Sequence, residues 1–338
     1  MTCKKISISQ YIPLINTCQI ILAGTALTAL LVYTKTVVMP FVIALFISMV
    51  CNTAATWMKE KWGLPHVLGL IFTVLLFLTF ILLSALFVGS SVENFIRGAD
   101  AYSQKLSYTV DWLLAKTAHF GMHIDTNAIN QYIDKIPVFN LVRTMGSNLF
   151  SFFTTTSLVS LFVIFLFMGA AKEKTALTNN IEKQISYYLI VKILVSLIAG
   201  ILVWIVLASI KTELALMLAF LTFFLNFIPN IGPFIATALP LPVLFLQYGF
   251  DWHIFLALFL LTAVHFIVGN ILETKWLGKG MDLSPVVVIA SLIFWALVWG
   301  VMGALLAVPL TSILKMLLEQ SEPTKPLAAM LTGKMPFK

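Results

Sequence analysis

Apolar runs long enough to cross a lipid bilayer recur along this chain, and two of them are too long for a single crossing. The shorter runs lie at 13–34, 37–58, 66–92, 147–171, 190–210 and 252–272, and the long ones at 213–248 and 284–318. An unbroken helix over either long run would extend roughly 50 Å, against about 30 Å of hydrocarbon. Because 60% of the 338 residues are hydrophobic and 10% are charged, we predict an all-α, polytopic helical membrane protein embedded in the lipid bilayer.

Both long runs are broken near their middles. The first contains Ile-Pro-Asn-Ile-Gly-Pro at 228–233, and the second contains Trp-Gly-Val-Met-Gly at 299–303 with Pro309 beyond it. Proline removes a backbone donor and clashes with the preceding turn, while glycine permits tight bends, so each run is predicted to be a helical hairpin. Irregular backbone at membrane depth is tolerated only where protein covers it or water reaches it, so we expect the hairpin tips to line a cavity.

The lysines support this arrangement. If the N-terminus is cytoplasmic and both long runs return to the side they left, only Lys35 and Lys211 occupy short external loops, in agreement with the positive-inside rule. With a single hairpin, the segments after it would change sides and place lysines of the last third outside. We therefore predict that both termini are cytoplasmic. Topology accounts for the net charge of +7, so no nucleic-acid partner is expected.

The runs divide the chain into four parts: N-terminal transmembrane helices at 1–92, an amphipathic extramembrane helical region at 93–145, a transport region at 146–320 and a cytoplasmic tail at 321–338. The second part combines balanced charge with apolar residues at helical spacing, so we expect it to lie outside, at the membrane surface or against a neighbour. Its histidines His119 and His123 are interpreted as surface residues near a turn, and no metal or cofactor is expected.

Polar residues inside apolar runs are costly and therefore indicate candidate functional positions. Asn226 and Asn230 flank the break that Pro229, Gly232 and Pro233 make in the first long run. Together with the freed backbone groups they could bind a hydroxyl-rich solute or a partly dehydrated cation, as discontinuous helices do in secondary transporters. The alternative is that both asparagines only cap the broken helix ends.

A second set of polar residues lies in the following run. His265, Gly269 and Glu273 recur every four residues, with Asn270 close to the same stripe, so an α-helix would align them on one face. A histidine and a carboxylate are titratable groups of the kind that proton coupling requires. Two alternatives stay open: His265 as a neutral packed residue, and Glu273 in a surface ion pair with the neighbouring Lys275.

Several motifs of the C-terminal half resemble those of the autoinducer-2 exporter (AI-2E) family of bacterial multi-pass membrane transporters. They are the Ile-Pro-Asn-Ile-Gly-Pro break, the Gly-Asn-Ile-Leu-Glu helix end at 269–273, the Gly-Lys-x-x-x-Leu-x-Pro turn at 278–285 and the Trp-Gly-x-x-Gly-x-x-x-Ala-x-Pro motif at 299–309. The segment at 39–50 resembles that family's second span. The chain departs from the family at Thr274, where proline is common, and at Ser284, where histidine is common.

The resemblance implies export of a small hydrophilic signal molecule in some members and sodium–proton exchange in others. We expect a secondary transporter that exports a small hydrophilic, autoinducer-2-like solute across the inner membrane, coupled to a proton or sodium gradient. We also place Gly300, Gly303 and Pro309, at the break of the second long run, on the transport path. The alternatives are a sodium/proton antiporter and a non-transporting membrane scaffold.

Other functions are not indicated by the sequence. It has no phosphate-binding Gly-x-x-x-x-Gly-Lys-[Ser/Thr] loop, no His-Glu-x-x-His and no Gly-x-Ser-x-Gly, so no enzyme is expected. Small residues such as Gly200 permit close helix packing within or between chains, and we expect a homo-oligomer.

Overall fold

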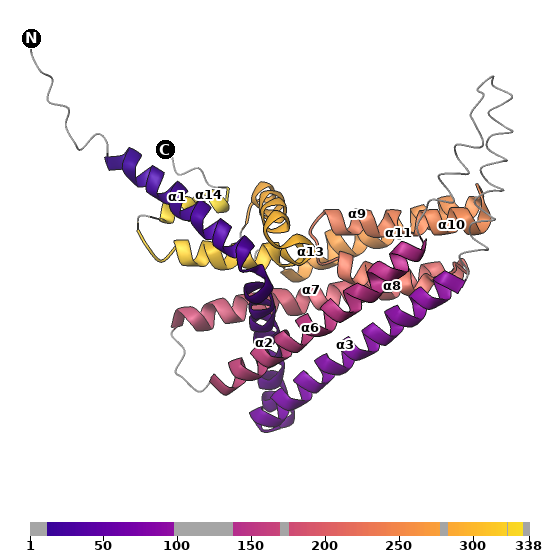
Figure 1. The fold of residues 1–338 in the computed structure, drawn as a ribbon, viewed down its shortest axis with the longest axis horizontal. Coiled ribbons are helices and arrows are strands. Elements are labelled where there is room, and N and C mark those ends of the chain that lie inside the picture. The colour runs from indigo at the N-terminus through magenta and orange to yellow at the C-terminus, as the bar shows by residue number, and fades with distance from the viewer. Residues whose placement is uncertain (1–11, 98–137, 170–175, 278–282, 323, 334–338) are drawn as a thin grey trace, which may run out of the picture.

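The computed structural model describes residues 12–97, 138–169, 176–277, 283–322 and 324–333, and within these ranges its regular structure is helical (Figure 1). The all-α prediction is confirmed for these residues. The elements are α1 (Ile12–Tyr33), α2 (Lys35–Trp62), α3 (His66–Arg97), α6 (Val138–Gly169), α7 (Ala176–Ser209), α8 (Ala215–Leu225), α9 (Ile231–Ala238), α10 (Pro240–Tyr248), α11 (Trp252–Phe266), the π-helix η2 (Ile267–Glu273), α12 (Thr274–Leu277), α13 (Pro285–Leu318) and α14 (Lys325–Leu331).

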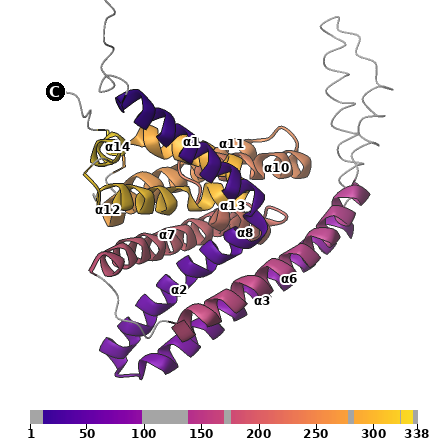
Figure 2. The ribbon, with the colours of Figure 1, turned by 60° about the vertical axis from the view of Figure 1, so that its left-hand side comes forward.

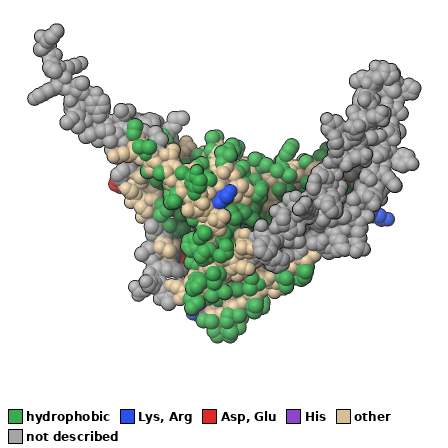
Figure 3. All heavy atoms as spheres, in the orientation of Figure 1, with side chains coloured by type: hydrophobic (Ala, Val, Ile, Leu, Met, Phe, Trp, Pro, Cys, Tyr) green, Lys and Arg blue, Asp and Glu red, His purple; other side chains and the backbone are tan. Residues whose placement is uncertain are grey.

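Hydrophobic side chains dominate the outer surface of the described helices (Figure 3). Four of the described helical stretches are long and apolar enough to cross a membrane: Lys35–Trp62, Thr178–Ser209, Trp252–Leu277 and Pro285–Leu318. A soluble protein would not leave so much contiguous apolar surface in water, whereas lipid solvates it. The prediction of a polytopic membrane protein is therefore confirmed.

Among the N-terminal helices, α2 packs against α7, while α1 lies across α13 (Figure 2). Thr34 alone separates α1 from α2, and α2 packs against both α3 and α6. Helix α2 ends at Gly63, whose φ of 67° supplies the left-handed cap that favours glycine. Helix α2 meets α7 and α13 in an apolar cluster of Phe46, Ile185, Tyr188, Leu189 and Val308.

Helix α7 contacts both halves of the molecule. One end packs against α2, and the other packs against α8 and α11 through Val203, Leu207, Leu218 and Leu261. It begins at Ala176, well before the apolar run predicted at 190–210. The difference arises because the apolar run marks only the membrane-embedded part, while helix formers such as Glu182 and Lys183 continue the helix beyond it.

The first long run is a helical hairpin, as predicted, built from α8 and from α9 with α10. Its two ends are held together by side chains from the end of α10. Gln247 accepts from the Glu213 N–H at 2.9 Å and donates to the Lys211 carbonyl at 2.8 Å, and the Tyr248 hydroxyl donates to the Ile210 carbonyl at 2.6 Å. The chain thus returns to the place from which the run departed.

The second long run is also a hairpin, although its two arms together form the single element α13. Gly300 interrupts the helix with φ 66° and ψ −144°, a conformation that side-chain-bearing residues rarely adopt. Beyond it the chain folds back, so that Trp295 Nε1 donates to Thr311 Oγ1 at 3.1 Å. In a straight helix these residues would stand about 24 Å apart.

Residues 98–137, which make up most of the predicted extramembrane region at 93–145, lie outside the described residues, as do His119 and His123. The location and amphipathic character of this region therefore remain predictions. The structure describes the two helices that border it, α3 up to Arg97 and α6 from Val138.

Candidate functional site

The break in the first hairpin brings a buried asparagine against α7. Asn226 follows the last residue of α8, its side chain is 1% exposed, and its Nδ2 donates to the buried Ser196 Oγ at 3.0 Å. A buried amide left without a partner costs about 1–3 kcal/mol, so this bond specifies where the tip rests. The side chain therefore links the hairpin to α7.

The turn after Asn226 depends on close approach of the backbone. A Cβ added to Gly232 would lie 1.8 Å from the Leu225 carbonyl oxygen, so only glycine fits there. The Pro229 carbonyl accepts from the Ile231 N–H at 2.6 Å, and Asn230 has φ 59°. Asn230 is exposed and makes no side-chain cap to α9, so the capping alternative does not describe it.

His265 of α11 lies beside the second arm of this hairpin. Its Nδ1 is 2.9 Å from the Leu261 carbonyl oxygen and 3.1 Å from Thr237 Oγ1. The Leu261 carbonyl can only accept, and Thr237 donates its own proton to the Pro233 carbonyl at 2.9 Å, so Nδ1 carries the imidazole proton. Nε2 is then a lone-pair acceptor, and it is buried without a hydrogen-bond partner among the described residues.

Glu273 forms an ion pair that the sequence analysis missed. Its Oε1 lies 2.5 Å from Nζ of Lys192, which belongs to α7 and is 3% exposed. The carboxylate thus pairs with Lys192 and not with Lys275, the alternative left open by the sequence, because packing of η2 against α7 brings Lys192 to it while Lys275 is exposed. The signal available in the sequence was a lysine inside the apolar run at 190–210, where an unpaired charge would be costly.

The stripe predicted for α11 does not form one helix face. Residues 267–273 adopt a π-helix, in which each turn holds more residues than an α-helical turn, and the Thr274 hydroxyl donates to the Gly269 carbonyl at 3.4 Å. His265 consequently contacts α9, Glu273 contacts α7, and Asn270 is exposed. Such π-helical turns often occur at functional sites.

The second hairpin meets the first through apolar side chains. Ile228 and Leu225 at the first tip pack with Leu292, Ala304 and Ala307 of α13. The tip of the first hairpin therefore packs against the two arms of the second, and the contact between them is apolar.

The remaining predicted site residues lie within α13. Gly300 makes its turn, a Cβ added to Gly303 would lie 1.9 Å from the Trp295 carbonyl oxygen, and Pro309 is buried in the second arm. These residues shape the second hairpin. The polar contacts of Asn226, His265 and Glu273 are made instead with α7, α9 and the backbone of α11.

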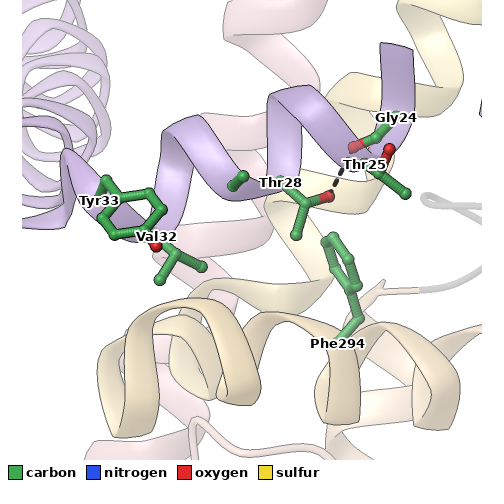
Figure 4. Close-up of a pocket in the computed structure, with 7 residues that line it drawn as sticks. Gly24, Thr25, Thr28, Val32, Tyr33 and Phe294 are labelled. Atoms are coloured by element: carbon green, nitrogen blue, oxygen red, sulfur yellow. Dashed lines mark hydrogen bonds between the residues drawn. The ribbon is translucent and has the colours of Figure 1, made fainter. Parts of the chain in front are cut away.

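A pocket between α1 and α13 lies apart from these residues (Figure 4). The Thr25 and Thr28 hydroxyls in its lining donate to α1 carbonyls at 3.0 and 2.8 Å, so they are already occupied. The rest of the lining is mostly apolar: Gly24, Ala29, Val32, Tyr33 and Phe294. We therefore place the candidate site at the buried polar residues between the first hairpin, α7 and α11.

Two broken helices that fold back, pack against each other and adjoin buried polar side chains define the class of polytopic membrane transporters. Comparison with known proteins agrees: the profile of the AI-2E family transporters matches residues 20–322, and the chain belongs to that family. The resemblance noted in the sequence is thereby confirmed.

Three relatives illustrate the similarity. AI-2 transport protein TqsA of Escherichia coli K12 is 28% identical over 309 residues, covering 88% of this chain and 89% of TqsA. A provisionally named transport protein of Haemophilus influenzae is 32% identical and covers 94% of this chain and 95% of its own. A similarly named Bacillus subtilis protein, YrrI, is 25% identical over 84% of this chain and 86% of its own. The chain is accordingly a multi-pass inner-membrane protein of a transporter family.

Proposed function

We propose that this protein is a secondary transporter that exports a small hydroxyl-rich solute, of which AI-2 is the first candidate, across the inner membrane. Its family membership and the name of the relative TqsA support the choice of solute. The observation that carries the choice of site is the bond between Asn226, at the break of the first hairpin, and Ser196 of α7.

A hydroxyl group of the solute could replace either partner in this hydrogen bond. An amide and a hydroxyl both donate and accept, so a polyol can take over their mutual bond without leaving a buried polar group unsatisfied. The hairpin is anchored by backbone-directed bonds at its far end, through Gln247 and Tyr248. Its tip is held by the Asn226 bond and apolar packing, so the tip is the part that solute binding would release.

The test is AI-2 efflux from a bacterial strain that lacks its own AI-2 exporter. Expression of this protein should raise extracellular AI-2, and an uncoupler should abolish the increase. Ser196→Ala should reduce efflux, whereas Ser209→Ala should not, because the exposed Ser209 hydroxyl on the same helix only donates to the Ile205 carbonyl. Equal efflux with and without the protein would reject AI-2 as the solute.

A sodium/proton antiporter is the second candidate, favoured by the partly buried ion pair of Lys192 and Glu273. Ionisable residues within apolar helices commonly mark ion pathways. Sodium added outside everted vesicles should then release protons from their acidified interior, and Glu273→Gln should abolish the response. Absence of both activities would favour the scaffold alternative.

A further inference from the structure

We propose that Lys192 is the resident counter-cation of a proton-binding site at Glu273, and that it keeps this site closed to protons until transport separates the two side chains. The inference deepens the proposed function, because it names the ion and the residue that control coupling. It adds Lys192 to the transport machinery.

The geometry of the pair makes its two members unequal. Nζ of Lys192 and Oε1 of Glu273 are 2.5 Å apart, but the lysine side chain is 3% exposed and the glutamate side chain 20% exposed. The carboxylate is therefore the member that solvent can reach. The ammonium approaches it from the protein interior, so its departure would leave a solvent-accessible carboxylate without a counter-charge.

The other groups near the carboxylate do not take the place of Lys192. On α7, the buried phenol of Tyr188 interacts electrostatically with Glu273 but carries no positive charge, and the Tyr187 hydroxyl donates to the Trp276 carbonyl at 2.6 Å. Lys275 beside Glu273 on its own segment is exposed. Lys192 is the cation that the described structure places on the carboxylate.

The position of Lys192 connects this pair with the hairpin tip. Lys192 and Ser196 are four residues apart on α7 and therefore share a helix face. Lys192 holds Glu273 of η2, and Ser196 holds Asn226 at the break of the first hairpin. A shift of either partner changes contacts on adjacent turns of the same face of α7, which supplies a short physical route between ion binding and tip release.

The proposed step conserves atoms and charge. A proton adds to a carboxylate oxygen of Glu273 and gives a neutral carboxyl group, while Lys192 keeps its three ammonium protons and loses its ion-pair partner. Loss of this proton to the opposite side restores the pair, so one proton crosses per cycle. A sodium ion would instead have to shed its water shell beside a second positive charge, which is costly at low dielectric.

The experiment needs no solute. The full-length protein is reconstituted into vesicles of bacterial phosphatidylethanolamine and phosphatidylglycerol containing a pH-sensitive dye, and the decay of an imposed pH gradient is followed with potassium and valinomycin present to dissipate any membrane potential. Wild type and Lys192→Arg should hold the gradient. Lys192→Met should dissipate it several-fold faster, and Lys192→Met combined with Glu273→Gln should hold it again, because both charges are then absent.

Each other outcome overturns the proposal. If Lys192→Met holds the pH gradient as the wild type does, Lys192 does not keep protons from the site. If the double variant dissipates the gradient, protons pass through a damaged fold. Faster entry of sodium than of protons, measured with a sodium dye, would assign the site to sodium. The two proposals can fail separately. If Lys192→Met leaks protons as expected but the wild-type protein does not raise extracellular AI-2, the proposed solute is wrong and the proton site stands.

Discussion

Gly303 lies so close to Trp295 that a Cβ added to the glycine would stand 1.9 Å from the tryptophan carbonyl oxygen. The contact joins the two sides of the Gly300 turn in α13. It is a contact to backbone, which cannot rotate away as the end of a side chain can. The second hairpin therefore depends on a glycine at this position.

We expect Gly303→Ala to lower the melting temperature of the purified full-length protein in detergent, because the hairpin must open to admit the methyl group. Overpacking of this kind typically costs about 1–3 kcal/mol. Gly24→Ala in α1 is the matched control, since no atom lies within 4 Å of its added Cβ. Equal melting temperatures for the two variants would contradict the close approach.

The ion pair of Lys192 and Glu273 predicts a strongly non-additive effect on stability. Lys192→Met leaves a carboxylate without its partner, and breaking a buried pair in this way costs about 3–5 kcal/mol, reduced here because Glu273 keeps some solvent contact. Adding Glu273→Gln should recover most of the loss. Thermal unfolding of the single and double variants measures the coupling, and additive effects would show that the pair contributes little.

The unpaired Nε2 of His265 predicts that replacing this residue lowers transport without lowering stability. Replacing the imidazole by the apolar side chain of His265→Leu removes a buried nitrogen that has no partner among the described residues, a group that typically costs about 1–3 kcal/mol. The variant should therefore melt no lower than the wild type, while AI-2 efflux falls. A large loss of stability would indicate that His265 has a structural role.

Asp251 and His253 predict a pH dependence at the loop between α10 and α11. Nδ1 of His253 lies 2.5 Å from Asp251 Oδ2, and this contact, followed by the Trp252 N–H, lowers the pKa of Asp251. A lowered carboxyl pKa contributes stability above the ordinary aspartate range and loses it as pH falls through the folded-state value. As the pH is lowered below about 5, the melting temperature of Asp251→Asn should therefore fall less than that of the wild type. Parallel curves would show that the contact is too exposed to matter.

The positive-inside arrangement predicts opposite sides for two exposed positions. In a background without Cys3, Cys18 and Cys51, an impermeant maleimide added to intact cells should label Phe250→Cys but not Glu322→Cys. Phe250 follows the first hairpin and Glu322 follows the second. Labelling of both positions would mean that the second hairpin crosses the membrane, and protection of Phe250→Cys would mean that the first one does.

The membrane class and both hairpins could be predicted from the sequence because they depend on local properties. Run length and hydropathy determine whether a segment enters lipid. Pro229 and Gly232 in one run, and Gly300 in the other, restrict the backbone wherever they occur. Family motifs such as Gly-Asn-Ile-Leu-Glu are likewise contiguous, so the transporter family was recognisable without a structure.

The partners within the candidate site were decided by the tertiary structure. Glu273 has a lysine two residues away in sequence, yet it pairs with Lys192, which is 81 residues distant. Asn226 likewise bonds Ser196 across 30 residues. Sequence patterns identify which side chains need a partner, because burying a polar group is costly wherever it occurs. Which partner is found depends on how helix faces pack, and the π-helical turn before Glu273 helps to determine which face meets α7.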